Sequence, residues 1–335
     1  MSLPAKALSV TGRGLVLGCA AAIALASAPA AFAQDYPSGP VELVVPWGTG
    51  GGTDRSARIY APYLSEALGV PVNVVNIEGG GGWVAWAQMA KWDPAADDHK
   101  IGIVNLPHVY SYLDPNMGRS ETVADFNFIT GQTFDPCLWM VRKGDERFSN
   151  LEEFVGYVKE HPGDIVVSTT AVGSDDYQGL AYAEKKIDGF QVGKVYANND
   201  AKKVQELLGE HTDAIAGNIS YYMPYINDGQ MQPLAVLSEK RSPYLPDVST
   251  FKEVTGVNNL CFAARVLTAA PGLPQEKYDV LAKAIDEASH NPEYMEQETS
   301  GSNEIWDIGG EDLQAFLKTT EQSVKDVEYW KSQDK

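Results

Sequence analysis

A strand, a glycine-rich turn and the start of a helix follow one another in Val44-Val45-Pro46-Trp47-Gly48-Thr49-Gly50-Gly51-Gly52-Thr53-Asp54. The apolar residues before the turn predict a buried strand, and apolar residues at three- and four-residue spacing after Thr53 predict a helix. Glycines let the backbone approach a ligand, and the first turn of a helix presents unpaired N–H groups at the positive end of the helix dipole. The stretch therefore predicts an anion site, although such a turn also occurs in α/β proteins for packing alone.

Strand and helix patterns alternate along the rest of the chain. Apolar runs bounded by turn residues predict strands over 73–75, 101–104, 138–141, 165–167, 192–196, 214–216, 234–237 and 262–267. Helical spacing predicts helices after Thr53 and Trp83, and over 151–158 (capped by Ser149), 177–186, 201–208, 218–225, 274–289 and 311–330. Repeated strand–helix units predict an α/β fold with mostly parallel sheets flanked by helices.

The composition fits a globular protein of one large or two medium domains. The chain has 335 residues, of which 44% are hydrophobic and 21% are charged. Its formal net charge is −19, whereas a nucleic-acid-binding protein is usually basic. We therefore expect no nucleic-acid partner.

The first 33 residues have the pattern of a cleavable signal peptide. Lys6 and Arg13 form a positively charged region before a mostly apolar segment over 15–28, and Ala31-Phe32-Ala33 matches a small-residue cleavage site. Leu17-Gly18-Cys19 vaguely resembles a lipoprotein signal, but the apolar run before it is shorter than such a signal needs. We expect an exported, periplasmic protein without a permanent membrane span.

Two cysteines, Cys137 and Cys261, remain after the signal peptide. In an oxidising compartment they can pair, but their spacing alone does not establish a disulfide. Nothing in the spacing indicates a metal site.

The usual motifs of cofactor binding and catalysis are absent. The dinucleotide fingerprint fails at Thr53, where a glycine is required, and no P-loop or GxSxG motif occurs. Asp175-Asp176 could form an acid pair, but adjacent acids at a helix start usually interact only with the helix dipole. The histidines show no metal-ligand spacing, and each is expected on the surface or in a loop: His99, His108, His161, His211 and His290. We predict no catalytic residue, no metal and no cofactor.

Polar loops follow several of the predicted strands. In open α/β sheets, ligands bind outside the carboxyl ends of the strands, and two such domains facing each other could clamp a small anion. The candidate ligand-binding residues are Trp47, Thr49, Gly50, Gly51, Gly52, Thr53, Asp54, Asn76, Asn105, Ser168, Thr169, Thr170, Gly173, Ser174, Asp175, Asp176 and Asn218.

Several stretches carry a family resemblance that extends over essentially the whole chain after the signal peptide. They are Tyr36-Pro37-Ser38-Gly39-Pro40, the glycine-rich turn, Ser238-Glu239-Lys240-Arg241-Ser242-Pro243-Tyr244-Leu245-Pro246-Asp247-Val248-Ser249-Thr250 and Ala269-Ala270-Pro271-Gly272-Leu273-Pro274. In these stretches the sequence resembles the periplasmic solute-binding proteins of tripartite tricarboxylate transporters, the TctC or Bug-like family.

The resemblance implies a two-domain Venus flytrap fold that closes on a small organic carboxylate. Domain 1 would comprise 36–136 and 261–335, and domain 2 would comprise 137–260. This layout places Cys137 and Cys261 near the hinge, where they could form a disulfide. The resemblance also implies a monomer that delivers its ligand to the membrane permease subunits, without cofactor, metal or enzymatic activity.

Departures from the family pattern bear on the ligand. The second ligand loop carries Asp175 and Asp176 where the family is commonly rich in serine and glycine, Gly217 replaces a frequent aspartate, and Ile77-Glu78 replaces a usual Arg-Pro. A carboxylate facing the cleft would repel the second carboxylate of a ligand, whereas a carboxylate that caps the helix would not. An amino acid or other amine-bearing acid is the alternative ligand, and ligand presentation to a chemoreceptor is the alternative role.

Overall fold

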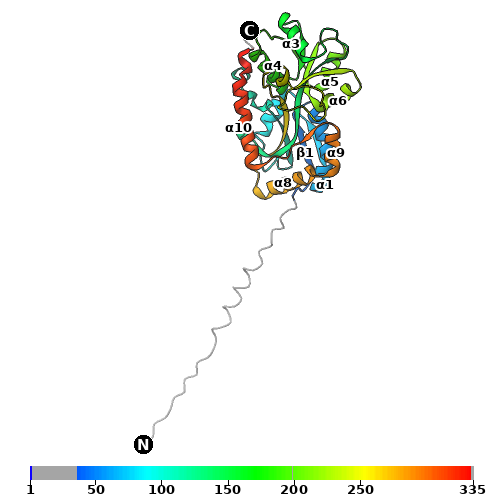
Figure 1. Ribbon diagram of the computed structural model, residues 1–335. Coiled ribbons are helices and arrows are strands. Elements are labelled where there is room, and N and C mark those ends of the chain that lie inside the picture. Colours follow the sequence, from blue (N-terminus) through cyan, green and yellow to red (C-terminus); the bar gives the residue numbers. More distant parts are fainter. Residues whose placement is uncertain (2–35, 198, 333–335) are drawn as a thin grey trace.

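The computed structural model describes Met1, residues 36–197 and residues 199–332 (Figure 1). Apart from Met1, the signal peptide predicted over residues 1–33 lies outside the described residues. The strands are β1 (Val41–Val45), β2 (Val72–Asn76), β3 (Lys100–Leu106), β4 (Asn127–Arg142), β5 (Val166–Thr169), β6 (Gly193–Tyr196), β7 (Ala214–Asn218), β8 (Met231–Val236), β9 (Phe262–Ala269) and β10 (Glu304–Ile305). The helices are α1 (Gly52–Leu68), α2 (Trp83–Met89), α3 (Leu151–Glu160), α4 (Asp175–Lys186), α5 (Asp200–Leu208), α6 (Ile219–Asn227), α7 (Phe251–Thr255), α8 (Gln275–Ser289), α9 (Pro292–Ser300) and α10 (Gly310–Val327), together with the short 3-10 helices η1 (Gly80–Gly82), η2 (His108–Leu113), η3 (Pro115–Met117), η4 (Val123–Asp125) and η5 (Tyr329–Ser332).

The α/β class predicted from the sequence is confirmed, and each predicted strand region contains a strand. One helix cap was wrong. α3 begins after Asn150, whose side chain accepts a hydrogen bond from the Glu153 N–H at 2.9 Å. Ser149 lies one residue earlier and donates instead to the Glu153 carboxylate, because Asn150 already occupies the capping position.

The strands follow the order β2-β1-β3-β9-β4-β7-β5-β6, with β8 and β10 paired to β4. β1 is parallel to β2 and β3, and β5 is parallel to β6 and β7. β4 and β9 run antiparallel to all their neighbours, so the sheet is mixed rather than mostly parallel. The reason is that β4 carries the chain out of the first half of the molecule and β9 brings it back, without a helical crossover between parallel neighbours.

β4 is long because it belongs to both halves. Its residues 127–136 pair with β9, and residues 137–142 pair with β7 and β8. This change of partners coincides with the first predicted crossing, and we call 36–136 with 261–332 the first half and 137–260 the second half. Cys137 and Cys261 lie at the two crossings and form a disulfide with a Cα–Cα distance of 5.2 Å. The pairing that the sequence left open is therefore formed.

Helices cover each half. Figure 1 shows α1, α8 and α9 around the first half and α3 to α6 around the second, with α10 running along one side of both. α10 packs against α4, and its Leu317 carbonyl accepts a hydrogen bond from the Tyr110 hydroxyl of η2 at 2.7 Å. α10 thus contacts both halves.

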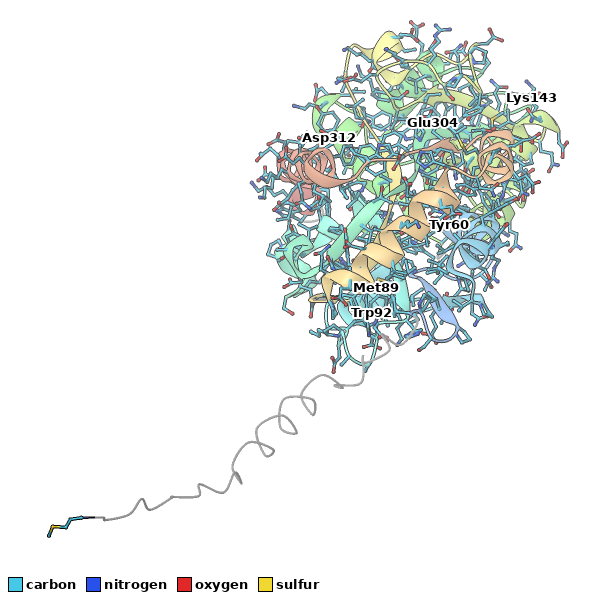
Figure 2. The ribbon with its side chains drawn as sticks, turned by 90° about the horizontal axis from the view of Figure 1, so that it is seen from below. Tyr60, Met89, Trp92, Lys143, Glu304 and Asp312 are labelled. Atoms are coloured by element: carbon cyan, nitrogen blue, oxygen red, sulfur yellow. A yellow bond between two sulfur atoms is a disulfide. The ribbon has the colours of Figure 1, made fainter. Side chains whose placement is uncertain are left out.

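The apolar residues of the predicted patterns form the core. On the underside of the first half, Tyr60 of α1 is fully buried and donates to the Ile285 carbonyl of α8 at 2.9 Å (Figure 2). The second half is centred on the buried Trp139 of β4, which stacks on Phe190. Together these cores hold the carboxyl ends of β1 and β5 facing a common gap. Within the described residues, no helix is both long enough and apolar enough to cross a membrane.

Candidate functional site

A small cavity lies between the two halves, where the loops after β1 and β5 meet. Its volume is about 40 Å³, which is room for few ordered waters. It is lined by Trp47, Gly51, Gly52, Thr53, Asn105, His108, Thr170, Asp175, Asn199, Asp200, Asn218, Ala263 and Arg265.

The wall from the first half is the start of α1. Gly51 is the N-cap without a side-chain cap, so the N–H of Gly52 is directed at the cavity. The Thr53 Oγ1 accepts hydrogen bonds from Asn105 Nδ2 at 3.0 Å and from Arg265 Nε at 3.4 Å. A hydroxyl has two acceptor lone pairs and one hydrogen, so the Thr53 O–H hydrogen is left to donate to another group. Trp47 Nε1 donates to Asn105 Oδ1 at 3.0 Å and fixes the orientation of that amide.

Asp54 and Asn76 shape this loop from behind. The Asp54 carboxylate accepts from the Gly50 N–H at 2.9 Å and pairs with Arg58 at 2.9 Å. Asn76 Nδ2 donates to Asp54 Oδ1 at 2.9 Å and to the Trp47 carbonyl at 2.8 Å. Partial burial alone would raise the pKa of Asp54, but the hydrogen bonds from Arg58, Gly50 and Asn76 hold it below its usual value. Both residues therefore organise the turn and do not line the cavity.

The two aspartates of the second loop have different environments. Asp176 is buried against Lys203, with Nζ 2.5 Å from Oδ2, and it accepts from the Thr170 N–H and hydroxyl at 2.9 Å. Burial alone would raise the pKa of Asp176, but the Lys203 ammonium lowers it. Ser174 caps α4. Asp176 is thus an internal ion-pair partner and does not line the cavity.

Asp175 lines the cavity. It accepts a hydrogen bond from Asn218 Nδ2 at 2.8 Å and is 3% exposed. Burial first, and then the charge of Asp176, raise the pKa of the Asp175 carboxyl. The sequence left open whether these acids face the cleft, and the structure divides the pair: Asp175 faces the cavity and Asp176 does not.

A buried ion pair underlies the cavity. Arg265 of β9 lies 3.8 Å from Asp135 of β4 through Nη2 and Oδ2. The Ser220 N–H, at 3.1 Å, and the Ser220 hydroxyl, at 2.5 Å, both donate to Asp135. Burial raises the pKa of Asp135 to about 6, against the opposing charge of Arg265 and the Ser220 hydrogen bonds.

His108 is buried beside the cavity rather than on the surface, which corrects the expectation from the sequence. Its ring packs edge-on against Trp47, with 5.0 Å between centroids. Nδ1 lies 3.4 Å from Asp175 Oδ1, yet neither ring nitrogen has a hydrogen-bond partner among the described residues. Burial lowers the pKa of His108 to about 3, so the neutral imidazole offers one N–H donor and one acceptor at neutral pH.

The structure brings together about half of the residues predicted for the site. Those lining the cavity are Trp47, Gly51, Gly52, Thr53, Asn105, Thr170, Asp175 and Asn218. The remaining predicted residues lie in or next to the same loops but do not line the cavity: Thr49, Gly50, Asp54, Asn76, Ser168, Thr169, Gly173, Ser174 and Asp176. Ser168, for example, donates to Glu206 at 2.7 Å in the second half.

Sequence reasoning missed five lining residues: His108, Asn199, Asp200, Ala263 and Arg265. For two of them a signal was present. Asn199 is the N-cap of α5, three residues after the predicted strand over 192–196, and Arg265 is a lone charge within an apolar strand. His108 lies in the polar loop over 105–108 that follows a predicted strand, but it was not chosen because a histidine in a loop is ordinary.

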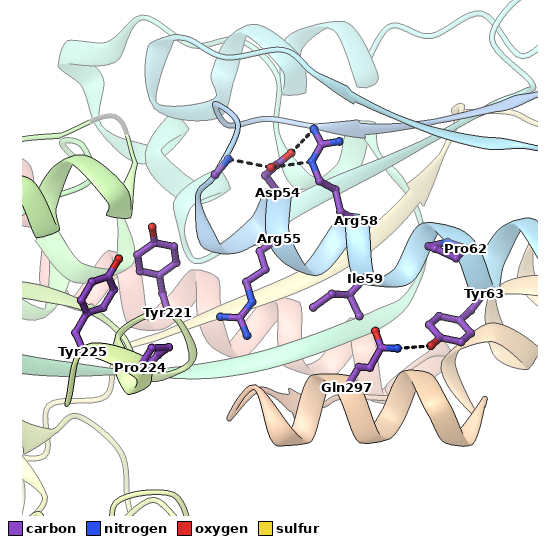
Figure 3. A pocket seen from close by; sticks show the side chains of 11 residues that line it. Asp54, Arg55, Arg58, Ile59, Pro62, Tyr63, Tyr221, Pro224, Tyr225 and Gln297 are labelled. Atoms are coloured by element: carbon purple, nitrogen blue, oxygen red, sulfur yellow. Dashed lines mark hydrogen bonds and ion pairs between the residues drawn. The ribbon is translucent and has the colours of Figure 1, made fainter. Parts of the chain in front are cut away.

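A larger open hollow adjoins the cavity. It has a volume of about 830 Å³ and lies between α1, α6 and α9. Figure 3 shows Arg55 and Arg58 of α1 on one wall and Tyr221 and Tyr225 of α6 opposite. Gly50 and Asp54 line this hollow rather than the smaller cavity. The residues at the start of α1, Gly51, Gly52 and Thr53, line the smaller cavity and not this hollow, so we place the candidate site in the smaller cavity.

Two groups of described residues bring three metal-ligand side chains together. One consists of Cys137, Cys261 and Asp175, whose sulfurs are joined in the disulfide and cannot act as thiolates. The other is the exposed group Asp286, His290 and Asp307, in which His290 contacts both acids at 3.3 and 3.4 Å. The exposed group lies outside the cavity.

Comparisons with known proteins place the chain in a family. The family model described as tripartite tricarboxylate transporter family receptor matches residues 56–328. The protein BugT of Bordetella pertussis is 28% identical over 251 residues, covering 71% of this chain and 72% of BugT, and a UPF0065 protein of the same organism is 27% identical over 300 residues, covering 88% and 90%.

Solved structures agree. The periplasmic binding protein BugD has a TM-score of 0.78 at 26% identity, covering 87% of this chain and 98% of BugD. A TctC solute-binding protein from Polaromonas has a TM-score of 0.65 at 28% identity, with coverage of 87% and 98%. MatC of Rhodopseudomonas palustris, solved with bound malate, has a TM-score of 0.74 at 24% identity, with coverage of 89% and 99%. The resemblance found in the sequence is confirmed. The chain belongs to the tripartite tricarboxylate transporter receptor family, whose members are solute-binding proteins.

Proposed function

We propose that this protein captures a small organic carboxylate in the cavity between its two halves, in the periplasm, and delivers it to the permease subunits of a tripartite tricarboxylate-type transporter. The observation that carries the proposal is the convergence of anion-binding donors at one point. The Gly52 N–H, the Thr53 hydroxyl and the Arg265 guanidinium meet at the start of α1. These donors can hold an anion reversibly through hydrogen bonds, so capture and release need no chemical step.

A thermal-shift screen of the purified protein tests the proposal. The panel contains monocarboxylates, dicarboxylates beginning with malate and adipate, aromatic acids and amino acids, each with its carboxamide. We expect at least one acid to raise the melting temperature and its amide to raise it less, because a ligand at 100 times its Kd adds about 2.7 kcal/mol of stability. A protein that binds no member of the panel would contradict the proposal.

The matched variants Thr53→Val and Thr49→Val test whether the acid binds in this cavity. Thr53 lines the cavity, whereas Thr49 is an exposed residue of the same loop outside it. We expect Thr53→Val to weaken binding about tenfold through loss of one hydrogen bond to a charged group, and Thr49→Val to leave the Kd unchanged. Equal effects would argue against this cavity.

An amino acid is the second candidate ligand. Asp175 and Asp200 both line the cavity, and either carboxylate could pair with an ammonium group. The same screen separates the two classes, because an amine-bearing acid would then bind more tightly than the acid of the same length without the amine.

A further inference from the structure

We infer that Arg265 binds the ligand carboxylate directly and that the Asp200 carboxylate competes with it for the same position at the start of α1, so that binding exchanges a protein carboxylate for a ligand carboxylate. The inference rests on the proposed function and adds the residues that select the charge of the ligand.

Arg265 has unused donors at the cavity. It is 2% exposed, and its Nη1 donates to Thr133 Oγ1 at 2.9 Å and to Asn303 Oδ1 at 3.4 Å. Nη2 forms an ion pair with the Asp135 carboxylate at 3.8 Å, which is beyond hydrogen-bond distance. A Cβ on Gly52 would lie 3.2 Å from this Nη2. The two N–H groups of Nη2 therefore have no hydrogen-bond partner among the described residues and lie beside Gly52, at the first amide of α1.

Asp200 reaches the same point from the second half. Its Oδ2 accepts from the Gly52 N–H at 3.2 Å, and a Cβ on Gly52 would lie 3.5 Å from that oxygen. Its Oδ1 accepts from the Tyr222 hydroxyl at 2.9 Å and lies 3.3 Å from Lys203 Nζ. One carboxylate oxygen thus occupies the anion position of α1, and the other stays attached to the second half.

This contact and a ligand carboxylate exclude each other. The cavity of about 40 Å³ has no room for a dicarboxylate beside Asp200, and two carboxylates on one amide would repel each other strongly at about 4 Å. When the halves separate, Asp200 keeps its partners Tyr222 and Lys203, whereas the Gly52 N–H and Arg265 are exposed to the incoming acid. Ligand binding then replaces the contact between Asp200 and Gly52.

The variant Asp200→Asn tests whether Asp200 competes with the ligand carboxylate or instead pairs with a ligand ammonium group. The amide oxygen can still accept from Gly52, but the competing negative charge is gone. We expect the acid that gives the largest shift in the panel to bind at least tenfold more tightly, measured by titration calorimetry. Unchanged or weaker binding would overturn the inference, and weaker binding of amino acids alone would assign Asp200 to a ligand ammonium.

The role of Arg265 is tested in an Asp135→Asn background, because removal of Arg265 alone would strand a buried carboxylate. Asp135→Asn is compared with Asp135→Asn/Arg265→Gln, each checked for folding by circular dichroism. We expect the Arg265 change to weaken binding of the acid about 10- to 100-fold, as expected for a charge-assisted hydrogen bond, and binding of its carboxamide by less than threefold.

Equal weakening of acid and amide would show that Arg265 only supports the fold, and an unchanged Kd would also overturn the inference. The two proposals fail differently. If the parent protein binds no acid in the panel, both are wrong. If it binds an acid but the Asp200 and Arg265 variants do not respond as expected, the proposed function stands and this inference is wrong.

Discussion

His108 is the residue whose environment departs most from what its sequence position suggests. Among the described residues this buried imidazole has no hydrogen-bond partner, and burial disfavours its charged form and lowers its pKa to about 3. In the unfolded chain the same group has a pKa near 6.5. The folded protein therefore keeps a neutral donor and acceptor beside Trp47 and Asp175, at the price of sensitivity to acid.

We predict that His108→Gln makes the free energy of unfolding less dependent on pH below pH 6.5. Below pH 6.5 the unfolded parent binds a proton on His108 that the folded parent does not, so this contribution to stability is complete above pH 6.5 and is lost as the pH falls toward 3. Between pH 4 and 6 we expect the free energy of unfolding of the variant to fall by about 1.4 kcal/mol less per pH unit of acidification than that of the parent.

Urea unfolding at several pH values measures this slope. His211→Gln, at an exposed histidine, is the matched control and should retain the parent slope. Asp135 contributes to the pH dependence with the opposite sign, because its raised pKa of about 6 gives stability that is lost as the pH rises through that value. This contribution is the same in all three proteins, so it cancels in the comparison. Identical slopes in the parent and His108→Gln would contradict the prediction.

At the scale of elements, α4 and α5 are joined by a buried ion pair. Lys203 of α5 and Asp176 of α4 are each 1% exposed and lie 2.5 Å apart. Lys203 also contacts the Ala216 carbonyl of β7 at 3.2 Å. A buried pair of this kind is weak proof of net stability, but removal of one partner strands the other charge. The pair therefore fixes how α4 presents Asp175 to the cavity.

We predict that Lys203→Met lowers the free energy of unfolding by about 3–5 kcal/mol, because the Asp176 carboxylate is left buried without a cation. The double variant Lys203→Met/Asp176→Asn should recover most of the loss. Lys325→Met, which removes a half-exposed pair with Glu321 on α10, should cost less than about 1 kcal/mol. Equilibrium denaturation measures all three, and a loss in Lys203→Met no larger than in Lys325→Met would refute the role of the pair.

At the scale of the whole molecule, the two halves are held by the crossing strands, by α10 and by the disulfide. The disulfide joins residues 124 positions apart and sits where β4 changes partners and where the chain returns toward β9. A cross-link over so long a loop removes much conformational freedom from the unfolded chain. It leaves the loops at the cavity free to separate.

We predict that Cys137→Ser/Cys261→Ser lowers the free energy of unfolding by about 3–5 kcal/mol, by the loop-closure argument, while the affinity for the best acid of the panel changes less than threefold. The double change avoids a free thiol, and thiol titration of the denatured, unreduced parent should detect none in the mature chain. A stability loss below about 1 kcal/mol would contradict the prediction.

The sequence by itself determined the features that depend on neighbouring residues. Apolar periodicity and turn residues were enough for most of the strands and helices, although α7, α9 and β10 were not predicted. The glycine-rich turn was enough to select Gly52, which lines the cavity between the halves. Both are local properties, since a helix start or a strand is encoded within about ten residues. The family resemblance supplied the layout in which Cys137 and Cys261 meet.

Only the tertiary structure decided which side chains share the cavity. Arg265, Asp200 and His108 come from three segments distant in sequence, and no local pattern relates them. The different environments of Asp175 and Asp176 depend on Lys203, which approaches from another helix. Charge and burial at the site are set by contacts across the sheet and between the halves, and those contacts exist only once the chain has folded.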